Sequence, residues 1–150
     1  YYAVAAASVE DTFETRVTVA VDAVGGRYLN EDFGSLGRSL AAERPDALLI
    51  MAWDSARNYE LFMPRVMEAA AAAGAEVLVI IPAYETMPLR EQAFDWLRRW
   101  VVENGVACAD ARSYVLGVPE AYWGDVVANP NHPNVLGHRL IGQVVAEMFR

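Results

Sequence analysis

The sequence contains no lysine, one cysteine and two histidines. The single cysteine, Cys108, excludes an internal disulfide, a two-cysteine zinc site and a dithiol redox couple. All twelve basic residues are arginine, against twenty acidic residues, which gives a net charge of −8. This balance disfavours a nucleic-acid backbone as partner, because phosphate binding needs a clustered positive face. We therefore expect no nucleic-acid partner, no metal and no organic cofactor.

Long hydrophobic runs are also absent. The apolar stretches ALLIMAW (residues 47–53) and VLVIIP (residues 77–82) fall far below the roughly 20 residues that span a bilayer. With 55% hydrophobic residues, 150 residues are enough for one well-buried core and few for two. We expect a soluble protein with a single domain over residues 1–150 and no membrane span.

Short β-rich runs alternate with longer helical stretches along the chain. We predict strands over residues 16–21, 47–53, 76–82 and 105–110, and helices over residues 32–44, 57–74, 88–105 and 135–149. Continuous apolar runs of this length are typical of strands that are buried on both faces. The alternation implies right-handed crossovers and a parallel sheet with helices on both sides. The predicted fold is an α/β three-layer sandwich.

In such a sheet, ligands bind beyond the carboxyl ends of the strands. The long segment after the fourth predicted strand contains NPNHPNVLGH at residues 129–138. The proline after His132 favours an extended or turn backbone at the histidine, so we place it in a loop rather than on a helix face. We expect Asn134 to cap the last helix by accepting a first-turn amide. These features fit a rigidly held catalytic base, and they also fit a structural loop.

The order of these pieces resembles the SGNH (GDSL) hydrolase superfamily, whose members are mostly esterases, lipases and carbohydrate deacetylases. Three features carry the resemblance: a strand followed by DAVGG (residues 22–26), a strand followed by AWDSAR (residues 52–57), and NxxHPNxxGH (residues 129–138) before the last helix. The resemblance covers nearly the whole chain. It implies the flavodoxin-like strand order of the SGNH hydrolase fold.

The resemblance also implies roles for individual residues. Gly26 matches the glycine whose backbone amide binds the oxyanion, and His132 matches the general base. Asn129 stands in place of the family's triad aspartate; it can orient a histidine through its carbonyl but cannot balance an imidazolium by charge. Asp54 stands in place of the family's oxyanion-binding asparagine, where a carboxylate would repel the developing charge. Trp53, beside it, is a candidate substrate contact.

Some assignments remain open at this level. Asp54 either points into the pocket or turns away to pair with Arg57 or to cap the helix that begins near Ser55, and we expect the cap. Asp125 is an alternative acid for the general base. His138, in the last helix, is expected to be structural.

The family's Gly-Asp-Ser nucleophile motif does not occur in the chain. The serines stand at positions 8, 35, 39, 55 and 113, and none follows a predicted strand in the required way. If the resemblance holds, the residues before RVTVAV end the family's first helix, and the strand that carries the nucleophile precedes Tyr1. That strand would lie between residues 16–21 and residues 47–53, so these two should not be direct neighbours.

The function implied by the resemblance is a serine ester hydrolase, either an esterase or a carbohydrate O-deacetylase, with O-acyl transfer as a related activity. The substrate would be a small acyl ester or an O-acylated carbohydrate. Four aromatic residues that follow predicted strands could stack on a sugar ring: Trp53, Tyr84, Tyr122 and Trp123. The alternative is a catalytically inactive SGNH-like binding module, which the changes at Asn129 and Asp54 favour. An unrelated flavodoxin-like domain lacks support, because no glycine-rich phosphate loop opens a helix.

Overall fold

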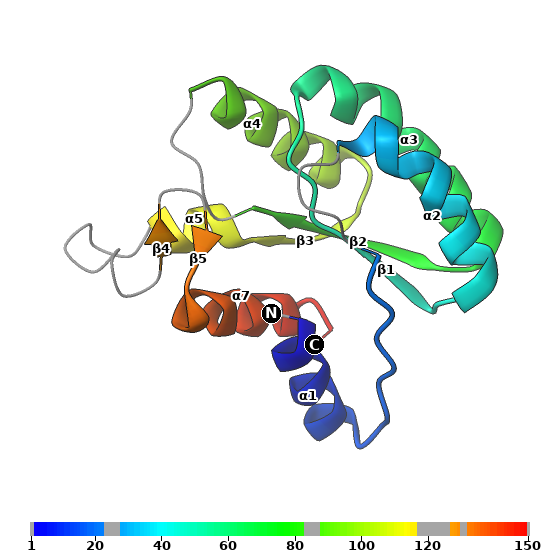
Figure 1. Ribbon diagram of the computed structural model, residues 1–150, viewed down its shortest axis with the longest axis vertical. Helices are drawn as coiled ribbons and strands as arrows, with labels where there is room; N and C mark the ends of the chain where they lie inside the picture. Colours follow the sequence, from blue (N-terminus) through cyan, green and yellow to red (C-terminus); the bar gives the residue numbers. More distant parts are fainter. Residues whose placement is uncertain (1, 23–27, 83–87, 117–126, 130–131, 150) are drawn as a thin grey trace. The chain divides into compact units, whose positions relative to one another are not determined.

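The computed structural model describes residues 2–22, 28–82, 88–116, 127–129 and 132–149 (Figure 1). Its elements are, in chain order, α1 (Tyr2–Phe13), α2 (Leu29–Glu43), β1 (Ala47–Ile50), α3 (Ala56–Ala73), β2 (Glu76–Ile81), α4 (Pro88–Glu103), β3 (Ala107–Asp110), α5 (Ala111–Leu116), β4 (Val127–Asn129), β5 (His132–Pro133) and α7 (Val135–Glu147). The chain forms two compact units. Unit 1 comprises Tyr1–Val19, Ile80–Thr86 and Cys108–Arg150, and unit 2 comprises Ala20–Val79 and Met87–Ala107.

The sheet has the strand order β1-β2-β3. β1 and β2 are parallel, with Ala47 opposite Glu76 and Ile50 opposite Val79. Parallel neighbours need a crossover connection, and α3 provides it. β2 is the middle strand and is buried from its second residue onward, whereas β1 at the edge is half-buried throughout. The continuous apolar run of β2 is therefore the sequence of a strand covered on both faces, and the predicted α/β class is confirmed.

In unit 2, α3 packs against both α2 and α4 (Figure 1). α3 begins at Ser55, whose side chain accepts a hydrogen bond from a first-turn amide, and ends at Gly74 in the left-handed conformation. Between α3 and α4, Tyr59 stacks on Trp96 with ring centroids 6.2 Å apart, and Trp96 stacks on Trp100 at 6.1 Å. These rings form an aromatic column that holds the two helices together.

In unit 1, α1 packs against α7 (Figure 1). Ala5 of α1 and Ile141 and Val145 of α7 are buried. The alanine-rich start of the chain is therefore a helix with one packed face, as expected for the residues that precede RVTVAV. No helix within the described ranges is long and apolar enough to cross a membrane.

The predicted strand over residues 16–21 does not form. Residues 15–22 belong to neither a helix nor a strand, and Val19 and Val21 are exposed. A β-rich composition is insufficient here because a strand needs a ladder partner, and none of the described strands pairs with these residues. Residues 16–21 are thus not paired with β1. A further strand between the two stays a prediction.

The remaining predicted elements are present with shifted ends. β1 and β3 are shorter than predicted, and α2 begins at Leu29 rather than at residue 32 because Tyr28 and Glu31 form a capping box. The amide of Tyr28 donates to Oε2 of Glu31 over 2.9 Å, which satisfies one donor at the helix start. α5 and the β4–β5 pair were not predicted.

Candidate active site

The predicted catalytic residues Asn129 and His132 lie on β4 and β5. These strands are antiparallel, with Asn129 opposite His132 and Val127 opposite Pro133, and the register is irregular between Val127 and Asn129. Directly opposed residues in such a ladder have Cα atoms roughly 4.5–5.5 Å apart. The backbone therefore brings the residue in the acid position next to the proposed base. The extended backbone at His132 confirms the conformation predicted from the proline that follows it.

The exit of this segment is fixed by a helix cap. Asn134 has an extended backbone, and its Oδ1 accepts a hydrogen bond from the amide of Gly137 over 3.0 Å. Its carbonyl oxygen accepts from the amide of His138 over 2.9 Å. The predicted N-cap is confirmed. His132 thus lies two residues before the N-cap of α7, the helix that packs against α1.

His138 is the fourth residue of α7, and its side chain is largely exposed. Partial burial lowers the pKa of His138 from its ordinary value of 6.5, because desolvation disfavours the charged imidazolium. The neutral ring is therefore the form that the folded chain favours near neutral pH.

Asp54 follows β1 and is buried, with 1% of its surface exposed. Its Oδ2 accepts from the amide of Leu29 over 2.8 Å. Its Oδ1 accepts from the amide of Ser55 and from Nδ2 of Asn58, both over 2.7 Å. Two of these donors belong to the N-terminal ends of α2 and α3, where the helix dipoles favour a negative charge. The buried carboxylate is thus compensated by three hydrogen bonds to neutral groups and by two helix ends.

The prediction that Asp54 is the cap of α3 was wrong in position. The N-cap is Ser55, and Arg57 is not among the donors to the carboxylate. Instead the carboxylate binds the starts of two helices, one of which begins 25 residues earlier in the chain. Sequence reasoning missed this role because the partner Leu29 is distant in the sequence and acts through its backbone.

Tyr59 anchors the loop between β1 and α3. Its hydroxyl donates to the carbonyl of Ala52 over 2.7 Å and accepts from the amide of Asp54 over 3.3 Å. Only 1% of Tyr59 is exposed, and its ring belongs to the aromatic column. Trp53 stands between the two anchored residues and is half-buried. The loop that carries this candidate substrate contact is therefore fixed on both sides of it.

Several residues singled out from the sequence lie outside the described residues: Gly26, Tyr84, Tyr122, Trp123 and Asp125.

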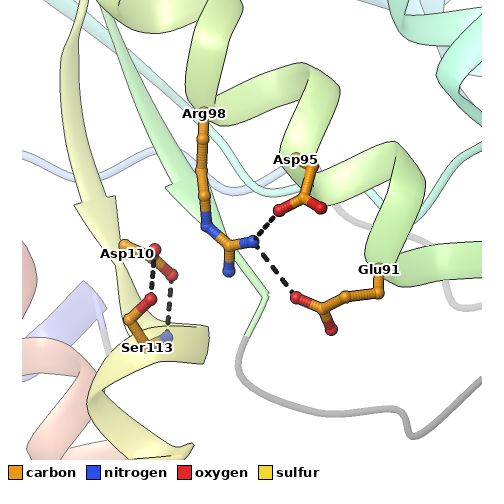
Figure 2. A network of polar contacts seen from close by, with 5 residues as sticks. All are labelled: Glu91, Asp95, Arg98, Asp110 and Ser113. Atoms are coloured by element: carbon orange, nitrogen blue, oxygen red, sulfur yellow. Dashed lines mark hydrogen bonds and ion pairs between the residues drawn. The ribbon is translucent and has the colours of Figure 1, made fainter. Parts of the chain in front are cut away.

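Three serine hydroxyls make contacts typical of surface turns and helix caps. Ser39 donates to Oδ2 of Asp22 over 2.8 Å, and Ser55 caps α3. At the carboxyl end of β3, Asp110 accepts from the hydroxyl of Ser113 over 2.6 Å and from its amide over 2.9 Å (Figure 2). Asp110 thereby acts as a cap for the start of α5. Each of these hydroxyls has a structural explanation.

The charged group on α4 has a structural explanation as well. Nη1 of Arg98 lies 3.1 Å from Oε1 of Glu91 and 2.7 Å from Oδ1 of Asp95 (Figure 2). Part-exposed pairs of this kind contribute little to stability. Within the described residues, no three histidine, cysteine or carboxylate side chains converge to hold a metal ion.

Comparison with known proteins finds a likeness of fold to solved structures. No family model matches the sequence, and no curated protein does. Among solved structures, an acetyl xylan esterase shares 12% identity with a TM-score of 0.81, over 98% of this chain and 89% of that one. A protein described as lipolytic and of the G-D-S-L family, from Desulfitobacterium hafniense, shares 13% identity with a TM-score of 0.79, over 96% of this chain and 87% of that one.

A third structure agrees with these two. A catalytic mutant of an acetylxylan esterase from Geobacillus stearothermophilus shares 14% identity with a TM-score of 0.71, over 97% of this chain and 76% of that one. Likeness at such identities establishes the fold. The chain has the fold of the SGNH (GDSL) hydrolases, which confirms the fold expected from the motifs.

Proposed function

We propose that this chain is the greater part of a serine ester hydrolase of the SGNH type, an esterase or carbohydrate O-deacetylase, in which His132 is the general base. The observation that carries the proposal is the pairing of Asn129 with His132 immediately before a capped helix, in a chain with the SGNH fold. A base needs its second ring nitrogen held by an acceptor, and Asn129 is the residue across the ladder.

The proposed reaction needs a serine from outside these 150 residues. The serine oxygen attacks the acyl carbonyl while its proton passes to the His132 ring, and the Gly26 amide stabilises the oxyanion. The ring then returns the proton to the departing alcohol oxygen, which leaves an acyl-serine. Water attacks the acyl-serine, again giving a proton to the ring, and the acid is released as serine is restored.

The proposed substrate is a small acyl ester or an acetylated carbohydrate. Two of the similar structures are named as acetyl xylan esterases, which supports an acetyl group on a sugar. The half-buried Trp53, held in a fixed loop, offers an aromatic surface of the kind that stacks on sugar rings.

The alternative is a binding module that has lost its chemistry. Two replacements favour it: an asparagine at position 129 and a carboxylate at position 54, where the family has an aspartate and an asparagine. Such a module would bind the acylated ligand without turning it over.

Hydrolysis of a chromogenic acetyl ester separates the two functions. The assay uses the intact protein, including any residues that flank this chain. Removing a general base costs about 100-fold to 10,000-fold in rate, so we expect this loss in His132→Ala. His138→Ala is the matched control, because His138 is the chain's other histidine and should leave the rate near that of the wild type. A wild-type rate no higher than that of His132→Ala would favour the binding module.

A further inference from the structure

Asn104 and Gly105 directly follow α4 and form the only Asn-Gly pair in the sequence. We propose that Asn104 is a site of spontaneous deamidation, and that its conversion to aspartate or isoaspartate releases the C-terminal turn of α4. A glycine after the asparagine favours this reaction, because no side chain hinders the approach of its backbone nitrogen to the asparagine amide. The chemistry involves no residue of the proposed esterase site.

The end of α4 is a Schellman motif that contains both residues. The helix ends just before Asn104, and Gly105 has a left-handed backbone with φ 63°. The amide of Val106 donates to the carbonyl of Val101 over 2.9 Å. The amide of Gly105 donates to the carbonyl of Val102 over 3.3 Å. This pair of bonds defines the motif and makes Asn104 the C-cap residue of the helix.

The nucleophile of the reaction is the backbone nitrogen of Gly105, and the structure holds it loosely. Its 3.3 Å bond exceeds the range of about 2.7–3.2 Å that is typical of N–H···O hydrogen bonds. Asn104 and Gly105 are both exposed, so water and hydroxide reach the turn. The Asn104 side chain is held by a bond from Nδ2 to the carbonyl of Trp100 over 2.8 Å. Attack therefore requires the loss of this bond and of one long backbone bond, at a helix end, where local opening costs least.

The reaction is a cyclisation followed by hydrolysis. A base removes the proton of the Gly105 amide, and the nitrogen forms a bond to Cγ of Asn104. The bond between Cγ and Nδ2 breaks, and the side-chain nitrogen takes up a proton and leaves as ammonia. Water then opens the cyclic imide at either carbonyl, which gives aspartate or isoaspartate. The net change consumes water and releases ammonia, without an oxidant or a reductant.

Either product loses a contact that holds the turn. The carbonyl of Trp100 accepts from Nδ2 of Asn104 and from its backbone amide, over 2.8 Å and 3.0 Å. An aspartate has no side-chain donor, and its charge lies beside the negative end of the helix dipole. An isoaspartate also adds one carbon to the main chain, which moves the amides of Gly105 and Val106 away from their acceptors. Because the Trp100 ring stacks on Trp96, the released turn adjoins the end of the aromatic column.

Asn104→Asp tests the consequence without waiting for the reaction, because it creates one of the two products. The variant loses the donor to Trp100 and gains a charge at the helix end, so we expect an unfolding temperature about 2–4 °C below that of the wild type. Asn104→Ala is the matched control, since it loses the donor without gaining the charge and should be destabilised less. An Asn104→Asp variant as stable as the wild type would overturn the release of the turn.

Peptide mapping of the aged protein tests the site itself. The intact protein is incubated at mildly alkaline pH below its unfolding temperature, and mass spectrometry follows the loss of the amide at each asparagine. We expect Asn104 to convert first, to a mixture of aspartate and isoaspartate. Asn58 is the internal control, because its Nδ2 is bonded to Asp54 and a bulky Tyr59 follows it, so its amide should persist. The site is overturned if Asn104 in the folded protein keeps its amide over the time in which the excised peptide that contains Asn104 and Gly105 converts.

Discussion

Asn129 of β4 and His132 of β5 are partners in the backbone register of the antiparallel ladder. An asparagine in this position can hold the imidazole by its carbonyl, but it adds no negative charge to stabilise the imidazolium that forms during the reaction. We therefore expect this pair to give a lower kcat than an Asp-His pair would give.

Substitution of Asn129 tests this relationship. We expect Asn129→Ala to lower kcat because the ring loses its acceptor, and Asn129→Asp to raise it. A carboxylate beside the ring raises a histidine pKa by about 1 unit or more, so the acid limb of the pH profile of kcat/KM should move upward in Asn129→Asp. A profile identical in both variants and the wild type would remove Asn129 from the site.

The cap at Asn134 makes a prediction about stability. Asn134→Ala leaves the amide of Gly137 without its partner, and loss of such a cap costs about 1 kcal/mol. Asn134→Ser, which keeps an accepting oxygen, should recover most of this loss. Urea denaturation measures both, and an equal loss in the two variants would mean that the cap is not the cause.

The hydroxyl of Tyr59 is expected to stabilise unit 2. Tyr59→Phe keeps the stacked ring but leaves the carbonyl of Ala52 and the amide of Asp54 without their partner. An unsatisfied buried polar group costs about 1–3 kcal/mol, so the unfolding free energy should fall by roughly that amount. A variant as stable as the wild type would show that water replaces the hydroxyl.

His138 makes a prediction about pH. Its pKa is lowered in the folded chain, so the unfolded chain takes up the proton first as the pH falls. The stability that the neutral ring contributes is therefore present above the ordinary value of 6.5 and is lost as the pH falls from there through the lowered pKa. As the pH falls from about 7.5 to about 5, the unfolding free energy of the wild type should therefore fall relative to that of His138→Gln. A relative rise toward acid would reverse the assigned direction.

The sequence predicted those parts of the fold that depend on local patterns. The apolar run of β2 and the cap at Asn134 are readable because their determinants lie within a few residues of one another. The strand over residues 16–21 was predicted wrongly because strand formation depends on a partner, which composition does not report. The SGNH fold was predictable because the motifs around residues 26, 54 and 132, and their order, resemble those of that superfamily.

The surroundings of Asp54 could not be predicted in the same way. Its identity suggested either a pocket residue or a cap, and both are common roles for an aspartate before a helix. Its actual partners include a backbone amide 25 residues away. Only the folded chain brings Leu29 and Asp54 together, so the bridge between the starts of α2 and α3 has no local signature.

Covalent labelling of the nucleophile tests the central claim most directly. A fluorophosphonate that reacts with activated serines is incubated with the intact wild-type protein and with the His132→Ala variant, and the labelled peptide is identified by mass spectrometry. The account predicts one labelled serine in the wild type, outside these 150 residues, and strongly reduced labelling in His132→Ala. Labelling of a serine at position 8, 35, 39, 55 or 113, or labelling that is equal in the two proteins, would contradict it.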